Sequence, residues 1–238
     1  ISGFMNVTGN MASGLHFSGV ANITGQSFGG LMASGLLNVV GEHMNGLQIA
    51  GIANITASKL NGVQVALCNY ATKARGLQIG LVNYYKEDMK GFQLGLVNAN
   101  PDTKVQMMVY GGNATPANIG VRFKNQLFYT ILGVGSMYQG LNDKFSASAS
   151  YRAGLSFPLY KGLSISGDLG YQHIEAFDNK DEVIPKRLYA LQARANLEYQ
   201  FTKKFGIFAT GGYGVTRFYN KSSNYDKGAI IEAGIVLF

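Results

Sequence analysis

The sequence predicts an all-β protein in which a C-terminal eight-stranded antiparallel transmembrane β-barrel is preceded by a parallel β-solenoid of 14–16-residue repeats. Three observations lead to this fold class. Apolar and polar residues alternate through most of residues 105–238, residues 1–104 repeat with a nearly fixed period, and no run approaches 18 consecutive apolar residues. The last point excludes a transmembrane helix, whereas barrel strands show only as alternation. We therefore expect a repeat domain over residues 1–104 and a barrel over residues 105–238.

Asparagine marks the repeat of the first domain. It recurs with spacings of 16, 16, 16, 15, 14 and 15 residues, at Asn6, Asn22, Asn38, Asn54, Asn69, Asn83 and Asn98. Related phrases precede it, such as GLQIAGIAN at Gly46, GVQVALCN at Gly62 and GLQIGLVN at Gly76. A second apolar position recurs before the glycine, as Met11, Phe28, Met44, Leu60 and Met89. A fixed period with fixed chemistry at each position indicates a repeat architecture.

The period limits what one repeat can be. A membrane hairpin needs two strands of about 9–11 residues plus turns, so one repeat is too short to hold it. One coil of a narrow parallel solenoid fits, and stacked coils bring equivalent side chains within about 4.8 Å, where amides form ladders. We expect one ladder through Asn22, Asn38, Asn54, Asn69, Asn83 and Asn98, and another through Gln48, Gln64, Gln78 and Gln93. The alternative is one membrane strand per repeat, which would give one continuous barrel of 14–16 strands, wide enough for a pore.

Alternation in the second domain predicts eight strands, the smallest even number for a bacterial outer-membrane barrel. They are Val105–Gly111, Ala117–Lys124, Leu127–Tyr138, Lys144–Leu159, Leu163–Glu175, Arg187–Phe201, Phe205–Phe218 and Gly228–Phe238. Several connections are tight, such as residues 125–126, and others are long, such as residues 178–186. This matches barrels with short periplasmic turns and long outer loops, if the chain ends on the periplasmic side.

The two faces of these strands differ in chemistry. In the strand at 187–201 we expect Leu188, at the rim, and then Tyr189, Leu191 and Leu197 to point outward, while Arg194 points inward. The inward charges are balanced: Arg122, Arg152 and Arg194 against Asp168, Glu198 and Glu232. An eight-stranded barrel is narrow enough for side chains to fill it, so we expect these six to cross-link a filled interior rather than to line a channel. Aromatic residues near strand ends are expected to form interfacial girdles: Tyr129, Tyr138, Tyr160, Tyr189, Tyr199, Phe201, Phe205 and Phe218.

The repeat phrases carry a family resemblance. GLQIGLVN at 76–83 and GFQLGLVN at 91–98, followed by FYTILGVG at 128–135, resemble the surface-repeat outer-membrane proteins of Bacteroides-type bacteria and Leptospira. The resemblance implies the outer membrane or surface of a Gram-negative bacterium and supplies no catalytic residues. The early unit GLMASGLLN at 30–38 departs from the Gln-containing phrase. Residues 233–238, AGIVLF, resemble the signal that the barrel-assembly machinery reads. Residues 1–5 show no signal peptide, so we expect a processed or trimmed start.

The sequence gives little sign of an active site. His16 and His43 are expected to be ladder or surface residues. His173 lies near Glu175, Asp178 and Asp181 in the sequence. An acid and histidine pair there could activate a nucleophile, and the alternative is a solvated histidine at the barrel rim. No ligand spacing for a metal is present, and no cofactor is expected. The lysines and arginines are not clustered with aromatics on one face, so nucleic acid is not an expected partner. Cys68, alone in the chain, is expected to be a packed thiol.

These observations lead to a functional expectation. We expect a non-enzymatic outer-membrane barrel protein whose repeat module mediates association, as a subunit of a larger outer-membrane or cell-surface assembly. The alternative is a larger barrel that acts as a pore for small solutes. Lys180, Lys186, Lys221 and Lys227 lie near the longer loops, where they could contact lipopolysaccharide phosphates or simply be solvated.

Overall fold

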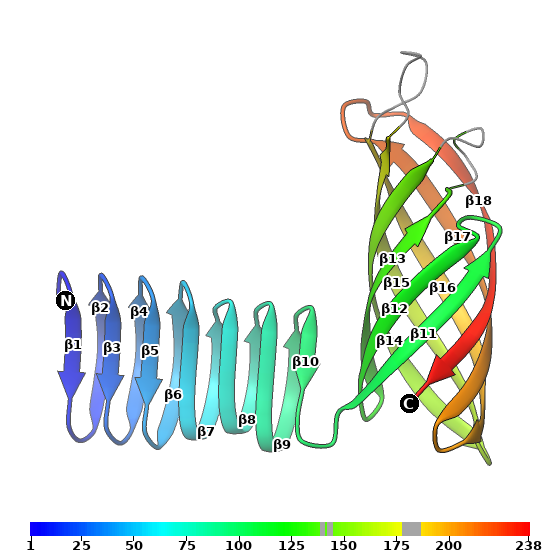
Figure 1. Ribbon diagram of the computed structural model, residues 1–238. Helices are drawn as coiled ribbons and strands as arrows, with labels where there is room; N and C mark the ends of the chain where they lie inside the picture. The colour runs from blue at the N-terminus through cyan, green and yellow to red at the C-terminus, as the bar shows by residue number, and fades with distance from the viewer. Residues whose placement is uncertain (139–140, 142–144, 178–186) are drawn as a thin grey trace. The chain divides into compact units, whose positions relative to one another are not determined.

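The computed structural model describes residues 1–138, 141, 145–177 and 187–238, and the chain forms two compact units, residues 1–102 and 103–238 (Figure 1). Within the described residues, no helix is long and apolar enough to cross a membrane. Each unit is built from strands, as the sequence predicts.

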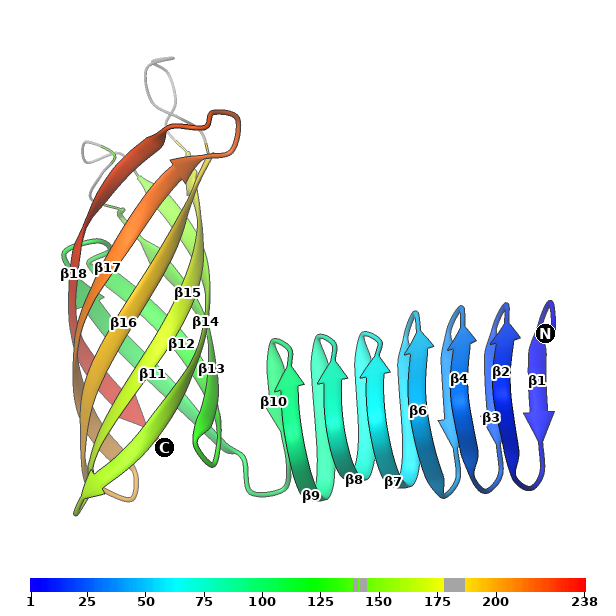
Figure 2. The same cartoon turned by 180° about the vertical axis from the view of Figure 1, so that it is seen from behind.

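The first unit is a parallel β-solenoid, which Figures 1 and 2 show from opposite sides. Equivalent residues of successive coils pair in parallel, as Asn38 does with Asn54. The wide barrel of 14–16 strands is therefore wrong, because membrane strands of such a barrel would be antiparallel neighbours. The strands are β1 (Met5–Thr8), β2 (Ala12–Ser18), β3 (Ala21–Thr24), β4 (Phe28–Ser34), β5 (Leu37–Val40), β6 (His43–Ala50), β7 (Ala53–Val65), β8 (Cys68–Ile79), β9 (Val82–Leu94) and β10 (Val97–Ala99).

The solenoid has two sheets. One stacks β1, β3 and β5 on the first halves of β7, β8 and β9, and the other stacks β2, β4 and β6 on their second halves. Glycine is needed where adjacent coils of one sheet meet: Gly62 pairs with Gly46 and has φ +140°, and a Cβ there would lie 1.9 Å from the carbonyl oxygen of Gly46. The glycine period of the sequence thus follows from the coil geometry.

An apolar cluster fills the space between the two sheets. It contains Phe28, Met32, Val40, Met44, Leu60, Ala71 and Ala74. Ala12, not Met11, pairs with Phe28, and Met11 is exposed, so our assignment of Met11 to this apolar position is off by one residue. Cys68 is exposed rather than packed, because its side chain is on the outer face of its strand while Asn69 points inward.

The second unit is a closed antiparallel barrel of eight strands, which confirms the predicted fold class. Its strands are β11 (Lys104–Gly112), β12 (Ala117–Asn125), β13 (Phe128–Ser136), β14 (Ser146–Tyr160), β15 (Leu163–Ala176), β16 (Arg187–Thr202), β17 (Phe205–Phe218) and β18 (Asn224–Leu237). β18 begins four residues before the expected Gly228, and it closes the barrel against β11. In β16, Leu191 and Leu197 are exposed on the outer face while Arg194 is buried inside.

Two apolar clusters lie inside the barrel. One contains Met108, Tyr110, Tyr129, Ile131, Phe208 and Val236, and the other contains Tyr138, Leu141, Ile174, Ala176, Leu188 and Ala190. Leu188 therefore points inward, opposite to our expectation, because it has the same strand parity as Arg194. Tyr129 and Tyr138 are buried too, and Phe218 packs against the second cluster, so these three do not belong to an outer girdle.

Candidate functional site

The barrel interior is the first candidate site, because it holds six buried charged side chains. Arg122, Arg152, Asp168, Arg194, Glu198 and Glu232 are each at most 8% exposed. Arg122 on β12 donates two hydrogen bonds to Glu198 on β16, at 2.6 and 3.0 Å, and a third to Gln106 on β11, at 2.6 Å. The forked geometry of a guanidinium matches a carboxylate, which makes such bidentate pairs strong and directional.

A second pair lies between β14 and β15. Arg152 donates to both carboxylate oxygens of Asp168 at 2.8 Å. Asp168 also accepts hydrogen bonds from the Tyr129 hydroxyl and from the Asn196 amide, each at 2.8 Å. The carboxylate is thus surrounded by donors from three other strands, β13, β14 and β16.

Glu232 on β18 contacts both Arg194 and Arg152. Arg194 donates to its two oxygens at 3.1 and 3.2 Å, and Arg152 forms a longer ion pair with it at 3.5 Å. The network therefore contains three positive and three negative groups, and all six are paired. Burying charges is costly unless they are paired and hydrogen-bonded, so the pairing offsets part of the cost of placing six charged side chains inside the barrel.

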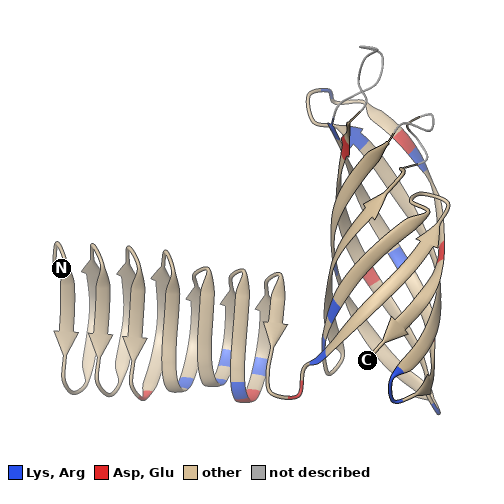
Figure 3. Cartoon of the chain, in the orientation of Figure 1, with Lys and Arg blue, Asp and Glu red and all other residues tan. Residues whose placement is uncertain are grey.

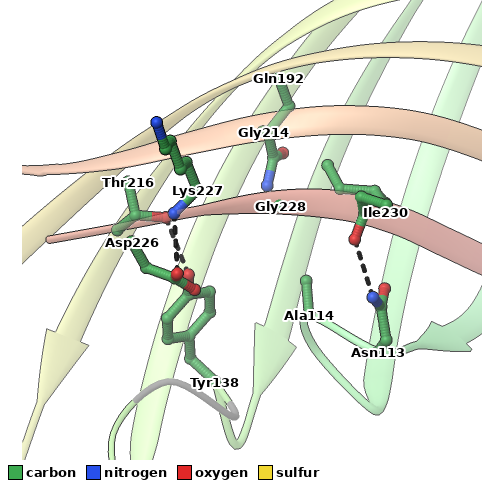
Figure 4. A pocket seen from close by; sticks show the side chains of 11 residues that line it. Asn113, Ala114, Tyr138, Gln192, Gly214, Thr216, Asp226, Lys227, Gly228 and Ile230 are labelled. Carbon is green, nitrogen blue, oxygen red and sulfur yellow. Dashed lines mark hydrogen bonds between the residues drawn. The ribbon is translucent and has the colours of Figure 1, made fainter. Parts of the chain in front are cut away.

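The network separates two cavities at the ends of the barrel. One, of about 260 Å³, is lined by Tyr138, Gln192, Asp226 and Lys227 among others (Figure 4). The other, of about 380 Å³, is lined by residues that include Gln106, Tyr160 and Glu198. A third cavity lies beside Arg122, Tyr129 and Arg152 and measures about 10 Å³. That is barely the size of one water probe, so this cavity has no room for a hydrated ion.

Sequence reasoning identified the charges but did not assign the polar side chains that bind them. Asn196 contacts Arg152, Asp168 and Thr210, and it links three strands in this way. Alternation in β16 already placed Asn196 inward, so the signal was present. Tyr129 could not be found in the same way, because an aromatic residue near a strand end fits a girdle equally well.

The solenoid ladders form the second candidate site. Each ladder asparagine donates to the side-chain oxygen of its equivalent in the next coil, in an unbroken series from Asn6 to Asn98 at 2.8 to 3.0 Å. The glutamine ladder runs over Gln48, Gln64, Gln78 and Gln93 at 2.8 to 2.9 Å. It ends at Met32, which takes the glutamine position in the preceding coil and lies 3.9 Å from the amide nitrogen of Gln48.

The three histidines have different surroundings. His16 occupies the glutamine position, in register with Met32 and Gln48 of the following coils, and its ring packs against Phe28 with 4.7 Å between ring centroids. His43 is exposed. His173 contacts the Tyr219 hydroxyl at 2.7 Å and Glu175 at 3.3 Å, and Glu175 is also held by Arg187. Burial and the neighbouring Tyr171 hydroxyl raise the pKa of Tyr219 to about 12, so this hydroxyl stays protonated. Asp178 and Asp181 lie outside the described residues.

The four lysines expected near lipopolysaccharide are only partly described. Lys180 and Lys186 lie outside the described residues. The Lys221 ammonium lies 5.3 Å from the ring centroid of Phe218, and Lys227 lines the cavity of Figure 4. Lipopolysaccharide contact stays a prediction.

Comparisons with known proteins give matches of structure. No family model and no curated protein matches the chain. The N-terminal β-barrel domain of Pseudomonas aeruginosa OprF matches with a TM-score of 0.40 and 16% identity, over 56% of this chain and 93% of that domain. Neisserial surface protein A (NspA) matches with a TM-score of 0.35 and 9% identity, over 56% of this chain and 92% of that one.

Proposed function

We propose that this chain is a non-enzymatic outer-membrane protein in which a filled eight-stranded barrel is the membrane anchor and the repeat module mediates association. The outer wall of the barrel supports the membrane location. Leu155, Leu169, Leu191, Leu197 and Ile231 are all about half exposed or more, and they lie on the face opposite the ion network. Large apolar residues over the whole outer face of a barrel favour lipid as its surroundings.

The closed lumen is the observation that carries the anchor role. Six paired charged side chains occupy the middle of the barrel, and the cavity beside Arg122, Tyr129 and Arg152 measures about 10 Å³, which is too small for a hydrated ion. We expect the purified chain to be nearly silent in planar lipid bilayers, where single-channel conductance is measured. Steady openings that scale with the size of the permeant ion would contradict an anchor and would support a pore.

The repeat module supports the association role, because its regular faces carry many exposed apolar residues. Phe92 and Leu94 on β9 are 75% and 52% exposed, which is unusual for a surface in water. We expect the chain to leave native membranes in a complex when a mild detergent is used, and native gel electrophoresis would measure its mass. A chain that runs as a single protein under those conditions would contradict the subunit role.

A further inference from the structure

One edge of the solenoid is apolar. It consists of the turns that follow β2, β4, β6, β7, β8 and β9. We call it the apolar edge and define it by Val20, Leu36, Ile52, Leu67, Leu81 and Leu96. From Leu36 to Leu96 these side chains are 37–51% exposed. The outward positions next to the edge are apolar too, on both sheets. On one sheet they include Leu37 and Val39, and on the other Leu31 and Ala33.

The opposite edge is polar, and we call it the polar edge. Figure 3 shows that the charged residues of the solenoid gather there. They are Glu42, Lys59, Lys73, Arg75, Lys86, Glu87, Asp88 and Lys90. Tyr70 on β8 and Tyr84 on β9 lie between the two edges, and their rings stack with 5.8 Å between centroids. Along their strands, the chain continues from these tyrosines to Lys73 and Lys86 of the polar edge. Tyrosine and lysine at the border of an apolar surface are typical of a membrane interface.

The backbone of the apolar edge is hydrogen-bonded from coil to coil. The amide of Ile52 donates to the carbonyl of Leu36 at 3.0 Å, and the amide of Cys68 donates to Ile52 at 2.8 Å. The ladder asparagines donate to the carbonyls just before the edge, such as Asn38 to Ile49 at 2.7 Å and Asn54 to Val65 at 3.0 Å. Polar backbone groups can enter hydrocarbon only when they are satisfied within the protein, and these groups meet that condition.

The depth of the apolar surface corresponds to one leaflet. It extends three residues from Leu36 to Val39 on one sheet, and five from Leu31 to Leu36 on the other. At about 3.3 Å per residue these distances are about 10 and about 17 Å. Half of a hydrocarbon core is about 15 Å thick.

We propose that the apolar edge of the solenoid inserts into one leaflet of a lipid bilayer, with the polar edge at the headgroups. This inference rests on the proposed membrane location, and it specifies lipid as a partner of the repeat module. Lipid fits better than a protein groove because the apolar surface is a ridge, exposed on the edge and on both adjoining sheet faces. Cations along the polar edge, including Lys59, Arg75 and Lys90, match the phosphates that border such a leaflet.

Cys68 provides the test, since it is the only cysteine and lies exposed next to Leu67 of the apolar edge. The full chain is placed in phosphatidylcholine and phosphatidylglycerol vesicles at a high lipid-to-protein ratio, and a charged maleimide is admitted to both sides by freezing and thawing. The matched control is Ala57→Cys on the polar edge, in a Cys68→Ser background. We expect Cys68 to react at least about tenfold more slowly than the control, because lipid excludes both the reagent and the thiolate. Both should react equally in urea.

Equal labelling of Cys68 and the polar-edge control in vesicles would overturn the insertion. Protection of Cys68 that disappears when the protein is diluted in lipid would also overturn it, because a second copy would then be the partner. A third variant, Leu197→Cys with Cys68→Ser, reports on the barrel wall independently. If that thiol reacts freely, the proposed membrane anchor fails, whatever the result at Cys68.

Discussion

At the scale of single residues, the Arg122 and Glu198 pair should be strongly coupled. Arg122→Met or Glu198→Leu alone leaves one buried charge without its partner, which costs about 3–5 kcal/mol of the free energy of unfolding. The double variant removes both charges, so we expect it to be clearly less destabilised than the sum of the two single variants. Urea unfolding in lipid vesicles measures all three.

The solenoid provides a matched control for this ion pair. Lys73 and Glu87 are 3.2 Å apart, but their side chains are 54% and 51% exposed. Exposed pairs contribute about 0–1 kcal/mol, so Lys73→Met should hardly change stability. Additive effects at Arg122 and Glu198 would mean that the two side chains do not interact in the folded barrel.

The sequence predicted which residues carry charge inside, but not which partner each one has. Strict alternation is enough to place Arg194 and Glu232 inside. The pairing of Arg122 with Glu198 depends on barrel closure and strand stagger, which bring β12 and β16 side chains together across the lumen. Alternation also explains the error at Leu188: a large apolar side chain suggested lipid, while its strand parity required the interior.

At the scale of the element, the asparagine ladder should contribute measurably to solenoid stability. Asn54→Ala removes hydrogen bonds to Asn38, Asn69 and Val65, and it leaves buried amide groups without partners. Each such group costs about 1–3 kcal/mol, so we expect amide hydrogen exchange in β7 and β8 to become at least about fivefold faster. Asn61→Ala is the control, because Asn61 bonds Asn45 in an exposed ladder. Equal exchange in the two variants would exclude a stabilising role for the buried series.

The repeat period favoured the coil and left one membrane strand per repeat as the alternative; the pairing of equivalent residues in a parallel stack decides between them. The period did not reveal that Cys68 is exposed, since an apolar phrase such as GVQVALCN reads as a buried strand. The phrase is apolar for another reason. Its polar members, Gln64 and Asn69, point into the coil, and its apolar members Val63, Val65 and Leu67 point outward. In this phrase, therefore, the amide side chains are inside and the larger apolar side chains are outside.

At the scale of the whole molecule, both units combine hydrogen-bonded amide or charged groups inside with apolar side chains on their outer faces, and each also has apolar clusters in its interior. In the barrel the inside contains Arg152 and Asp168, and in the solenoid it contains the asparagine and glutamine ladders. The average composition conceals this, since mean hydropathy is +0.05. The inner and outer faces can be distinguished in the sequence only by its periodicity, which is two residues in the barrel and 14–16 residues in the solenoid.

A membrane around the barrel predicts a dependence on depth that a water-exposed barrel would lack. Ala195 is exposed on the outer face near the middle of β16, and Thr202 is exposed at its end. Ala195→Arg should lower the free energy of unfolding in lipid vesicles by about 2–4 kcal/mol, and Thr202→Arg by about 0–1 kcal/mol, because the cost of a cation falls toward the interface. Urea titrations followed by tyrosine fluorescence give both values. If the two arginines cost the same small amount, as substitutions on a solvated surface do, the outer wall of the barrel does not contact hydrocarbon.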